Sequence, residues 1–192
     1  MKTAWGGDRG TMTPTETLKH EHQIVLLVLE GMERETQKLQ ARVPADYEAL
    51  RRIVDFARNF TDRCHHAKEE KHLFPAMERR GQPADRGPIA VMLLEHAQGR
   101  ERVKAIAGAL PGAEQGDLAA RSALLENLTA YITLLRNHIA KEDNVLFPLA
   151  DRLLTPGDQK ALEENFEWVE AVEMGEGTHE RYHQLAHELG KK

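Results

Sequence analysis

The feature that most constrains this chain is a motif that occurs twice, as HHAKEEKHLFP over residues 65–75 and as HIAKEDNVLFP over residues 138–148. When the two copies are aligned on Leu-Phe-Pro, a histidine followed four residues later by a glutamate falls at the same place in each copy. A Glu-His dipeptide precedes each copy, at residues 21–22 and 95–96. The sequence therefore predicts two copies of one helical hairpin.

The spacing of histidine and glutamate in each copy indicates a shared ligand site. Residues four positions apart lie on the same face of a helix, one turn from each other. Two hairpins packed about a pseudo-twofold axis would bring six side chains together: His22, His65, Glu69, His96, His138 and Glu142. Burying so many imidazoles and carboxylates costs free energy unless they are paired or bind a metal.

The number and type of these six side chains indicate which metal they would bind. A structural zinc site takes four ligands, so six predict two metal ions bridged by the carboxylates, with positions left open for a small molecule. A mixed set of imidazoles and carboxylates suits iron best, with manganese and zinc as alternatives.

The rest of the chain predicts an all-α fold. Thr13, Pro14 and Glu16 form a helix start with a capping box, and apolar residues recur at helical spacing after it. Helices are expected over about residues 14–40, 46–80, 88–108 and 117–154, with a loop over 110–116, a fifth helix from residue 155 and a short last helix capped by Thr178. Long helices with short connections favour an antiparallel up-and-down four-helix bundle. We expect a loose segment over residues 1–12, the bundle over 13–154 and a helical extension over 155–192 packed on it.

The composition argues against several classes of partner. Hydrophobic residues make up 41% of the chain, enough for a substantial core, and the net charge of −5 argues against binding to a nucleic-acid backbone. No apolar stretch approaches the ~20 residues of a membrane span. Cys64 is the only cysteine, so no intrachain disulfide can form. These features favour a cytoplasmic protein with no nucleic-acid or membrane partner.

The repeated motif resembles that of the hemerythrin-like, HHE cation-binding family of bacterial type, over residues 13–154. The resemblance implies a four-helix bundle with a non-haem di-iron centre, bridged by an oxo or hydroxo group. Carried over by position, the ligands would be His22, His65, Glu69, His96, His138 and Glu142, with Glu69 and Glu142 bridging the two ions.

One position departs from the pattern of the oxygen-carrying hemerythrins. They have a second histidine one turn after the third-helix histidine, and this chain has Arg100 there. Four histidines with two glutamates look more like the iron–sulfur repair and iron-sensing branches of the family. Reversible oxygen carriage is therefore disfavoured, unless His20, His72 or a C-terminal histidine fills the gap.

The predicted centre is compatible with three kinds of function. The first is a di-iron protein that binds or senses O2, NO or peroxide, or handles iron for redox response or iron-centre repair. The second is a di-iron enzyme that reduces peroxide or NO. It would need an external electron donor, since the sequence shows no flavin, haem or CxxC motif. The third is a metal-dependent interaction module whose C-terminal helix signals to a protein partner. Homodimer formation stays open in all three.

Several polar residues outside the six have their own interpretation. His66 and Glu70 form a second His-x3-Glu pair, one residue out of phase with the first. We interpret them as surface residues or as partners of the ligands, because the other copy has Ile139 in place of His66, although Asp143 matches Glu70. A shift of the ligand pair by one residue, from His65 and Glu69 to His66 and Glu70, is the alternative. Cys64 is expected in the core and His20 on the surface.

The C-terminal extension contains HExxH over residues 179–183, the pattern of zinc metalloproteases. We expect no protease site there, because the motif follows a stretch interrupted by glycines close to the end of the sequence, with no room for a third ligand and a cleft. His179, His183 and His187 share one helix face, which we interpret as solvent-exposed, with support of the di-metal site or a weak extra metal site as alternatives. Phe166, Trp168 and Val169 are expected to pack on the bundle. Glu163, Glu167 and Glu170 are expected to be exposed, although one could hold a ligand imidazole.

Overall fold

The computed structural model describes residues 12–175 and 177–191, so the loose segment expected over residues 1–12 lies outside the described residues except for Met12. The first long helix is α1 (Pro14–Gln40). The second helical stretch consists of α2 (Tyr47–Phe56), the π-helical segments η2 (Ala57–His66) and η3 (Glu69–Leu73), and α3 (Phe74–Arg79). The third is α4 (Gly87–Glu114), and the fourth consists of α5 (Leu118–Lys141), η4 (Glu142–Leu146) and α6 (Phe147–Leu153).

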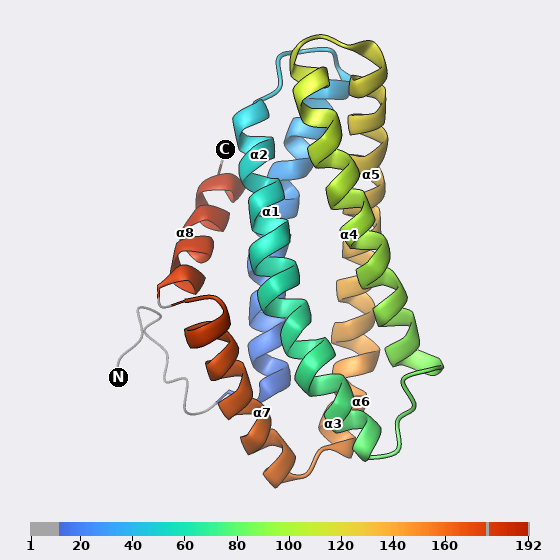
Figure 1. Ribbon diagram of the computed structural model, residues 1–192, viewed down its shortest axis with the longest axis vertical. Coiled ribbons are helices and arrows are strands. Elements are labelled where there is room, and N and C mark those ends of the chain that lie inside the picture. Colours follow the sequence, from blue (N-terminus) through green and yellow to red (C-terminus); the bar gives the residue numbers. More distant parts are fainter. Residues whose placement is uncertain (1–11, 176, 192) are drawn as a thin grey trace.

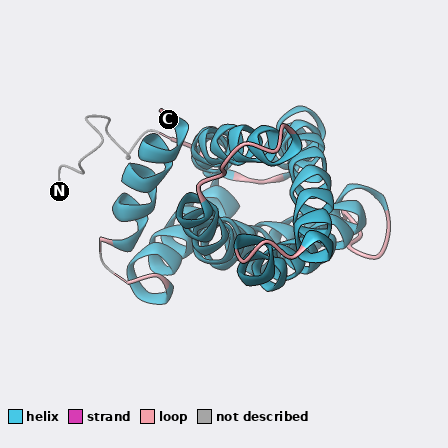
Figure 2. Cartoon of the chain, turned by 90° about the horizontal axis from the view of Figure 1, so that it is seen from above, coloured by secondary structure: helices cyan, strands magenta, loops and turns pink. Residues whose placement is uncertain are grey.

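These four stretches form the expected all-α antiparallel bundle. Successive stretches run in opposite directions along the long axis of the molecule (Figure 1). Both α1 and α4 contact α2 and α5, so the four stretches close a ring that is seen end-on in Figure 2. The predicted capping box at Thr13 and Glu16 is present at the start of α1. Gly81 ends the second stretch with a φ of 93°, a conformation that glycine adopts without steric cost.

The core of the bundle consists of two apolar clusters with a polar layer between them. On α1, Leu18 belongs to one cluster and Ile24 to the other, and His22 lies between them. On the second stretch, Phe60 and Leu73 belong to different clusters in the same way. The apolar clusters supply the hydrophobic stabilisation of the fold, and they enclose the layer in which the predicted ligands lie.

Each Leu-Phe-Pro motif is preceded by a wider, π-helical turn. The Phe74 N–H donates to the Glu69 carbonyl, and the Phe147 N–H donates to the Glu142 carbonyl, five residues back instead of four. The proline that follows has no N–H, and in an α-helix its ring would clash with the carbonyl four residues back. A one-residue expansion relieves that clash. Because each π turn begins at a predicted glutamate ligand, the proline helps to fix the backbone from which the carboxylate projects.

The prediction of a loop over residues 110–116 is wrong for residues 110–114, because α4 continues to Glu114 and only Gln115 and Gly116 form the turn. Pro111 lies inside the helix and lacks one helical hydrogen bond. Ala113 is nevertheless buried, and Tyr47 Oη donates a hydrogen bond to the Ala113 carbonyl at 3.1 Å. The packing of this last turn therefore outweighs the cost of the proline.

The C-terminal extension consists of α7 (Pro156–Trp168), η5 (Val169–Glu173) and α8 (Thr178–Gly190), and it lies along one side of the bundle (Figure 1). α7 contacts α1 and η3, η5 contacts η2, and α8 contacts α1 and α2. Phe166 and Val169 are buried as expected, whereas Trp168 is 49% exposed. Thr178 does not cap α8 as predicted, because the cap position is Gly177, whose φ is 74°.

Gly31 allows α8 to approach α1 closely. A Cβ at this position would lie 2.9 Å from the carbonyl oxygen of Leu189, a backbone atom of α8. We expect Gly31→Ala to displace the end of α8 and to lower the free energy of unfolding by about 1–3 kcal/mol, measured by denaturant titration. The matched control is Gly108→Ala in α4, where a Cβ would meet nothing within 4 Å. That change should stabilise the helix by about 0.5–1 kcal/mol, and a loss of stability at both positions would contradict the role of Gly31.

Candidate metal centre

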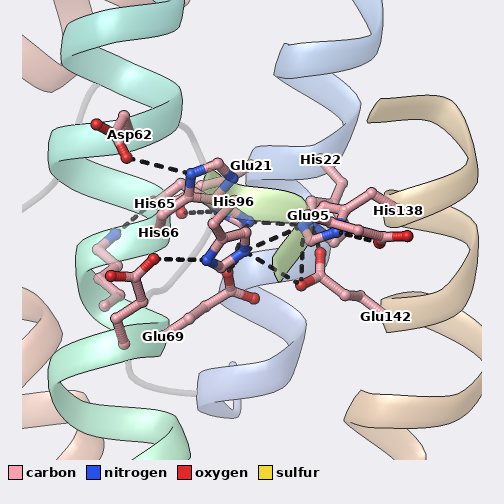
Figure 3. A network of polar contacts seen from close by, with 12 residues as sticks. Glu21, His22, Asp62, His65, His66, Glu69, Glu95, His96, His138 and Glu142 are labelled. Atoms are coloured by element: carbon pink, nitrogen blue, oxygen red, sulfur yellow. Dashed lines mark hydrogen bonds and ion pairs between the residues drawn. The ribbon is translucent and has the colours of Figure 1, made fainter. Parts of the chain in front are cut away.

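Imidazoles from all four helical stretches meet in the polar layer (Figure 3). The Nε2 atoms of His22 and His65 lie 3.0 Å apart, and those of His96 and His138 lie 3.1 Å apart. None of the four residues is more than 2% exposed. The layer therefore has two halves, a His22/His65 half and a His96/His138 half.

Glu69 and Glu142 lie between these two halves. The two oxygens of Glu142 face opposite halves, at 3.1 Å from Nε2 of His22 and 3.2 Å from Nε2 of His138. Oε2 of Glu69 lies 3.4 Å and 3.9 Å from the nearest Nε2 atom of each half. Both carboxylates are fully buried, and their oxygens have no hydrogen-bond partner among the described residues. Such oxygens are costly without a cation beside them. Protonated imidazoles supply that charge in the metal-free protein, and a metal ion would supply it to neutral imidazoles, so this six-residue centre fits bound metal.

A carboxylate holds each of the four imidazoles on the side away from the centre. The Nδ1 to oxygen distances are 2.8 Å from His22 to Asp143, 2.8 Å from His65 to Glu21, 2.7 Å from His96 to Glu70 and 3.0 Å from His138 to Glu95. These four outer carboxylates each come from a different helical stretch than the histidine they hold. A carboxylate on Nδ1 fixes the ring and leaves the Nε2 lone pair for a metal.

The four outer carboxylates occupy equivalent positions in the two copies of the repeat, so the sequence could have identified them. Glu21 and Glu95 are the first residues of the two Glu-His dipeptides, and Glu70 and Asp143 directly follow the two predicted glutamate ligands. Glu70 was expected to be a surface residue or a partner of the ligands, and in the structure it contacts Nδ1 of His96. The sequence assigned no role to the other three. Each contacts a histidine of another helix, and the spacing of residues along a single helix does not reveal such a contact.

Two equivalent lysines differ in their surroundings. Lys68 binds the outer carboxylate Glu21, and Lys141 binds the outer carboxylate Glu95. Lys68 is fully buried and also donates to Glu170 of η5 at 2.7 Å, whereas the side chain of Lys141 is 40% exposed. The C-terminal extension therefore covers the outer side of the His22/His65 half.

The interpretation of the C-terminal histidines as one exposed face is wrong for His179 and His183, which are 6% and 1% exposed. Nε2 of His179 lies 3.3 Å from Oε1 of Glu21, so His179 contacts the outer carboxylate that holds His65. The reason is long-range packing, since α8 lies against α1. His187 and His20 are exposed as expected.

Outside the six-residue centre, Glu21, Cys64 and His179 form a further group of potential ligands, which lies behind the His22/His65 half. Burial raises the pKa of the Cys64 thiol, so it stays protonated and is a poor metal ligand. Lys68 already supplies a cation to Glu21. These side chains therefore form a buried ionic cluster, with Cys64 in the core as predicted.

Without metal, the centre favours protonated imidazoles between ionised carboxylates. Burial disfavours the charged form of His22, but Asp143 and Glu142 outweigh it and raise its pKa to about 10. Nearby carboxylates likewise outweigh burial at His96 and raise its pKa to about 9. Burial would raise the pKa of Glu142, yet the facing imidazoles hold it well below its usual range. A metal that binds here must displace protons from the imidazoles.

A cavity of about 240 Å³ adjoins the His96/His138 half, between η2, α4 and α5. Both of these histidines contribute to its wall, together with Arg100 and Tyr131. Gly99 also lines the cavity, and a Cβ there would make ordinary contact with the Tyr131 ring at 3.8 Å. A volume of this size admits small molecules, because one water occupies about 30 Å³ in the liquid.

Loss of an outer carboxylate should weaken metal binding without removing a ligand. Glu70 accepts hydrogen bonds from His96 and Arg100, both at 2.7 Å. We expect Glu70→Gln to lower metal affinity roughly 10- to 100-fold, with unchanged stoichiometry at saturation, measured by competition with a coloured chelator. The matched control is Glu78→Gln, an exposed residue of the same helical stretch. Equal affinities in the two variants would contradict the role of Glu70.

The chain belongs to the hemerythrin HHE cation-binding family. Residues 12–150 match the Hemerythrin HHE cation binding domain, which confirms the family that the repeated motif indicated. The chain is also 30% identical to uncharacterized proteins of Mycobacterium tuberculosis and Mycobacterium bovis over 169 residues, or 86% of its length. The match covers 64% of the length of these relatives. Among the described residues, no helix combines the length and the apolar character needed to cross a bilayer.

Proposed function

We propose that the six-residue centre holds two iron ions and that this pair binds O2, NO or peroxide. The protein would then sense such a ligand, or handle iron for redox response or iron-centre repair. The observation that carries the proposal is the position of Glu142, whose two oxygens face His22 and His138 at 3.1 Å and 3.2 Å. A carboxylate with one oxygen toward each half suits a bridge between two cations better than a single site.

Each side chain of the centre has a role in this proposal. His22 and His65 would hold one ion, His96 and His138 the other, and Glu69 and Glu142 would bridge them. Bound iron supplies Lewis acidity and electrons. The outer carboxylates keep each Nε2 lone pair directed at the centre, and the apolar clusters on both sides keep bulk water away from it.

The position of the cavity favours the binding of a small ligand and indicates the side from which the ligand approaches. It adjoins the His96/His138 half, whereas the C-terminal extension covers the outer side of the other half. We therefore propose that the ligand reaches the iron pair between η2, α4 and α5. A cavity of about 240 Å³ has room for diatomic molecules and peroxide.

A ligand titration of the iron-loaded, reduced protein tests this function. We expect the absorption spectrum to change with at least one of NO, O2 and peroxide, in proportion to the iron present. Gly99→Leu would fill part of the cavity and should slow binding while leaving iron content unchanged. Gly108→Leu, at an open position on the same helix, is the control. A spectrum that responds to none of the three ligands would contradict the proposal, and sustained consumption of peroxide or NO with added reductant would identify an enzyme.

A further inference from the structure

We infer that His66 is a further metal ligand, on the side of His96 and His138, so that the two metal ions are held by different numbers of imidazoles. This inference rests on the proposed function, because it assigns one more residue to the same centre. His66 was expected to be a surface residue or a partner of the ligands. The structure places it inside the polar layer, 5% exposed.

The position of the ring is the first observation in favour. His66 directly follows His65 but faces the opposite half. Its ring stacks on that of His96, with centroids 3.8 Å apart and planes at 17°, and its centroid lies 5.8 Å from that of His138 (Figure 3). Because an imidazole binds a metal in its own ring plane, one of the two stacked rings must turn for both Nε2 atoms to reach the same ion. The potential ligand atoms of the centre fall into two groups, and within each group all of them lie within 4.8 Å of one another. One group is His22, His65 and Glu142, and the other is His66, Glu69, His96 and His138. The second group has one more imidazole than the first.

The nitrogen atoms of His66 are the second observation. Its Nε2 is buried and has no hydrogen-bond partner among the described residues. Its Nδ1 lies 3.4 Å from Oδ1 of Asp62, one turn earlier on the same helical stretch. A carboxylate on Nδ1 and a buried Nε2 is the arrangement of the four other imidazoles, although this contact is longer. A buried nitrogen without a partner is unfavourable unless a cation accepts its lone pair.

Arg100 explains why a histidine of η2 would take this position. Arg100 lies one turn after His96 on α4 but cannot itself be a ligand, because a guanidinium has no lone pair for a metal. Its nitrogens instead donate to Asp62 and Glu70, both at 2.7 Å. These are the carboxylates on Nδ1 of His66 and His96. The histidines expected to fill the gap, namely His20, His72 or a C-terminal one, do not belong to this group of ligand atoms.

The second copy of the repeat has no imidazole equivalent to His66. The second copy has Ile139 at the position equivalent to His66, and Ile139 lies in the apolar core, 4% exposed. Only one half of the centre can therefore gain a third imidazole. The two iron ions would differ in their ligands, and spectroscopy can detect such a difference.

The test compares the full-length protein with His66→Leu, which keeps a buried side chain but removes both nitrogens. We expect the iron-loaded wild type to give two distinct Mössbauer doublets of equal area. We expect His66→Leu to lose the distinct doublet of one iron and to bind its second iron at least ~100-fold more weakly, because outer partners alone are worth roughly 10- to 100-fold. If His66→Leu does not fold, His66→Gly with and without added imidazole replaces it, and imidazole should restore the second iron.

His72→Leu is the matched control, because Nε2 of His72 is also buried without a hydrogen-bond partner but belongs to no ligand group with the centre. It should keep both irons and both doublets. A wild type with two irons, together with a His66 variant of the same affinity and spectrum, would overturn the role of His66 and leave the proposed function standing. A wild type that holds fewer than two irons would overturn the proposed function and the inference together.

Discussion

Replacement of both central carboxylates, Glu69→Gln together with Glu142→Gln, is expected to reduce the iron content from two ions per chain to fewer than one. Glutamine has almost the same shape as glutamate but no charge. Both positions are fully buried, so the variant would leave two multivalent cations among neutral donors in a buried layer. An uncompensated buried charge is strongly unfavourable. Iron per chain after anaerobic loading and gel filtration measures the effect.

The control for this variant changes the charge by the same amount at a different place. Glu163 and Glu164 are exposed on α7, away from the polar layer, and Glu163→Gln with Glu164→Gln should keep two irons. Circular dichroism should show the same helix content in both double variants. If the Glu69 and Glu142 variant also retained two irons, these residues would not be the bridging ligands.

The metal-free protein is expected to lose stability as the pH rises from about 6.5 to about 10. The pKa of His22 is raised from 6.5 to about 10 in the fold, because the neighbouring carboxylates outweigh burial. A raised pKa means that protonation stabilises the fold fully below about pH 6.5 and that this stabilisation is lost as the pH passes the folded value. The pKa of His96, raised to about 9, acts in the same direction. Thermal unfolding of chelator-treated protein across this range measures the loss.

Iron should remove this pH dependence and raise the melting temperature. Metal binds the neutral imidazoles, so the iron-loaded protein has no imidazole protons to lose in this range. Metal at about 1,000 times its dissociation constant stabilises by about 4 kcal/mol, which corresponds to roughly 10 °C for a chain of this length. A melting temperature of the metal-free protein that stays constant from pH 6.5 to 10 would contradict the protonated state of His22 and His96.

The sequence was sufficient to predict the fold and the proximity of the six side chains. The reason is that His65 and Glu69 are four residues apart on a helix and that the spacing recurs at His138 and Glu142. Local spacing of this kind depends only on helix geometry. The role of the six residues as ligands stays a prediction until metal is measured.

Other features depended on contacts that local spacing does not contain. His66 has no counterpart in the second copy of the motif, which has Ile139 at the equivalent position. The repeat alone therefore did not predict that His66 lies inside the polar layer. The burial of His179 and the pairing of Glu170 with Lys68 arise from the packing of the C-terminal extension on the bundle. The π turns before Pro75 and Pro148 have no signature in the apolar spacing of the helices, because they arise from the effect of each proline on the preceding backbone.

The most direct test of the di-iron centre is the iron content per chain, measured together with the ultraviolet and visible spectrum of the purified protein before and after reduction. We expect two irons per chain and a charge-transfer absorption of a bridged pair that disappears on reduction. One metal ion per chain, or none after careful iron loading, would contradict a di-iron centre at these six residues.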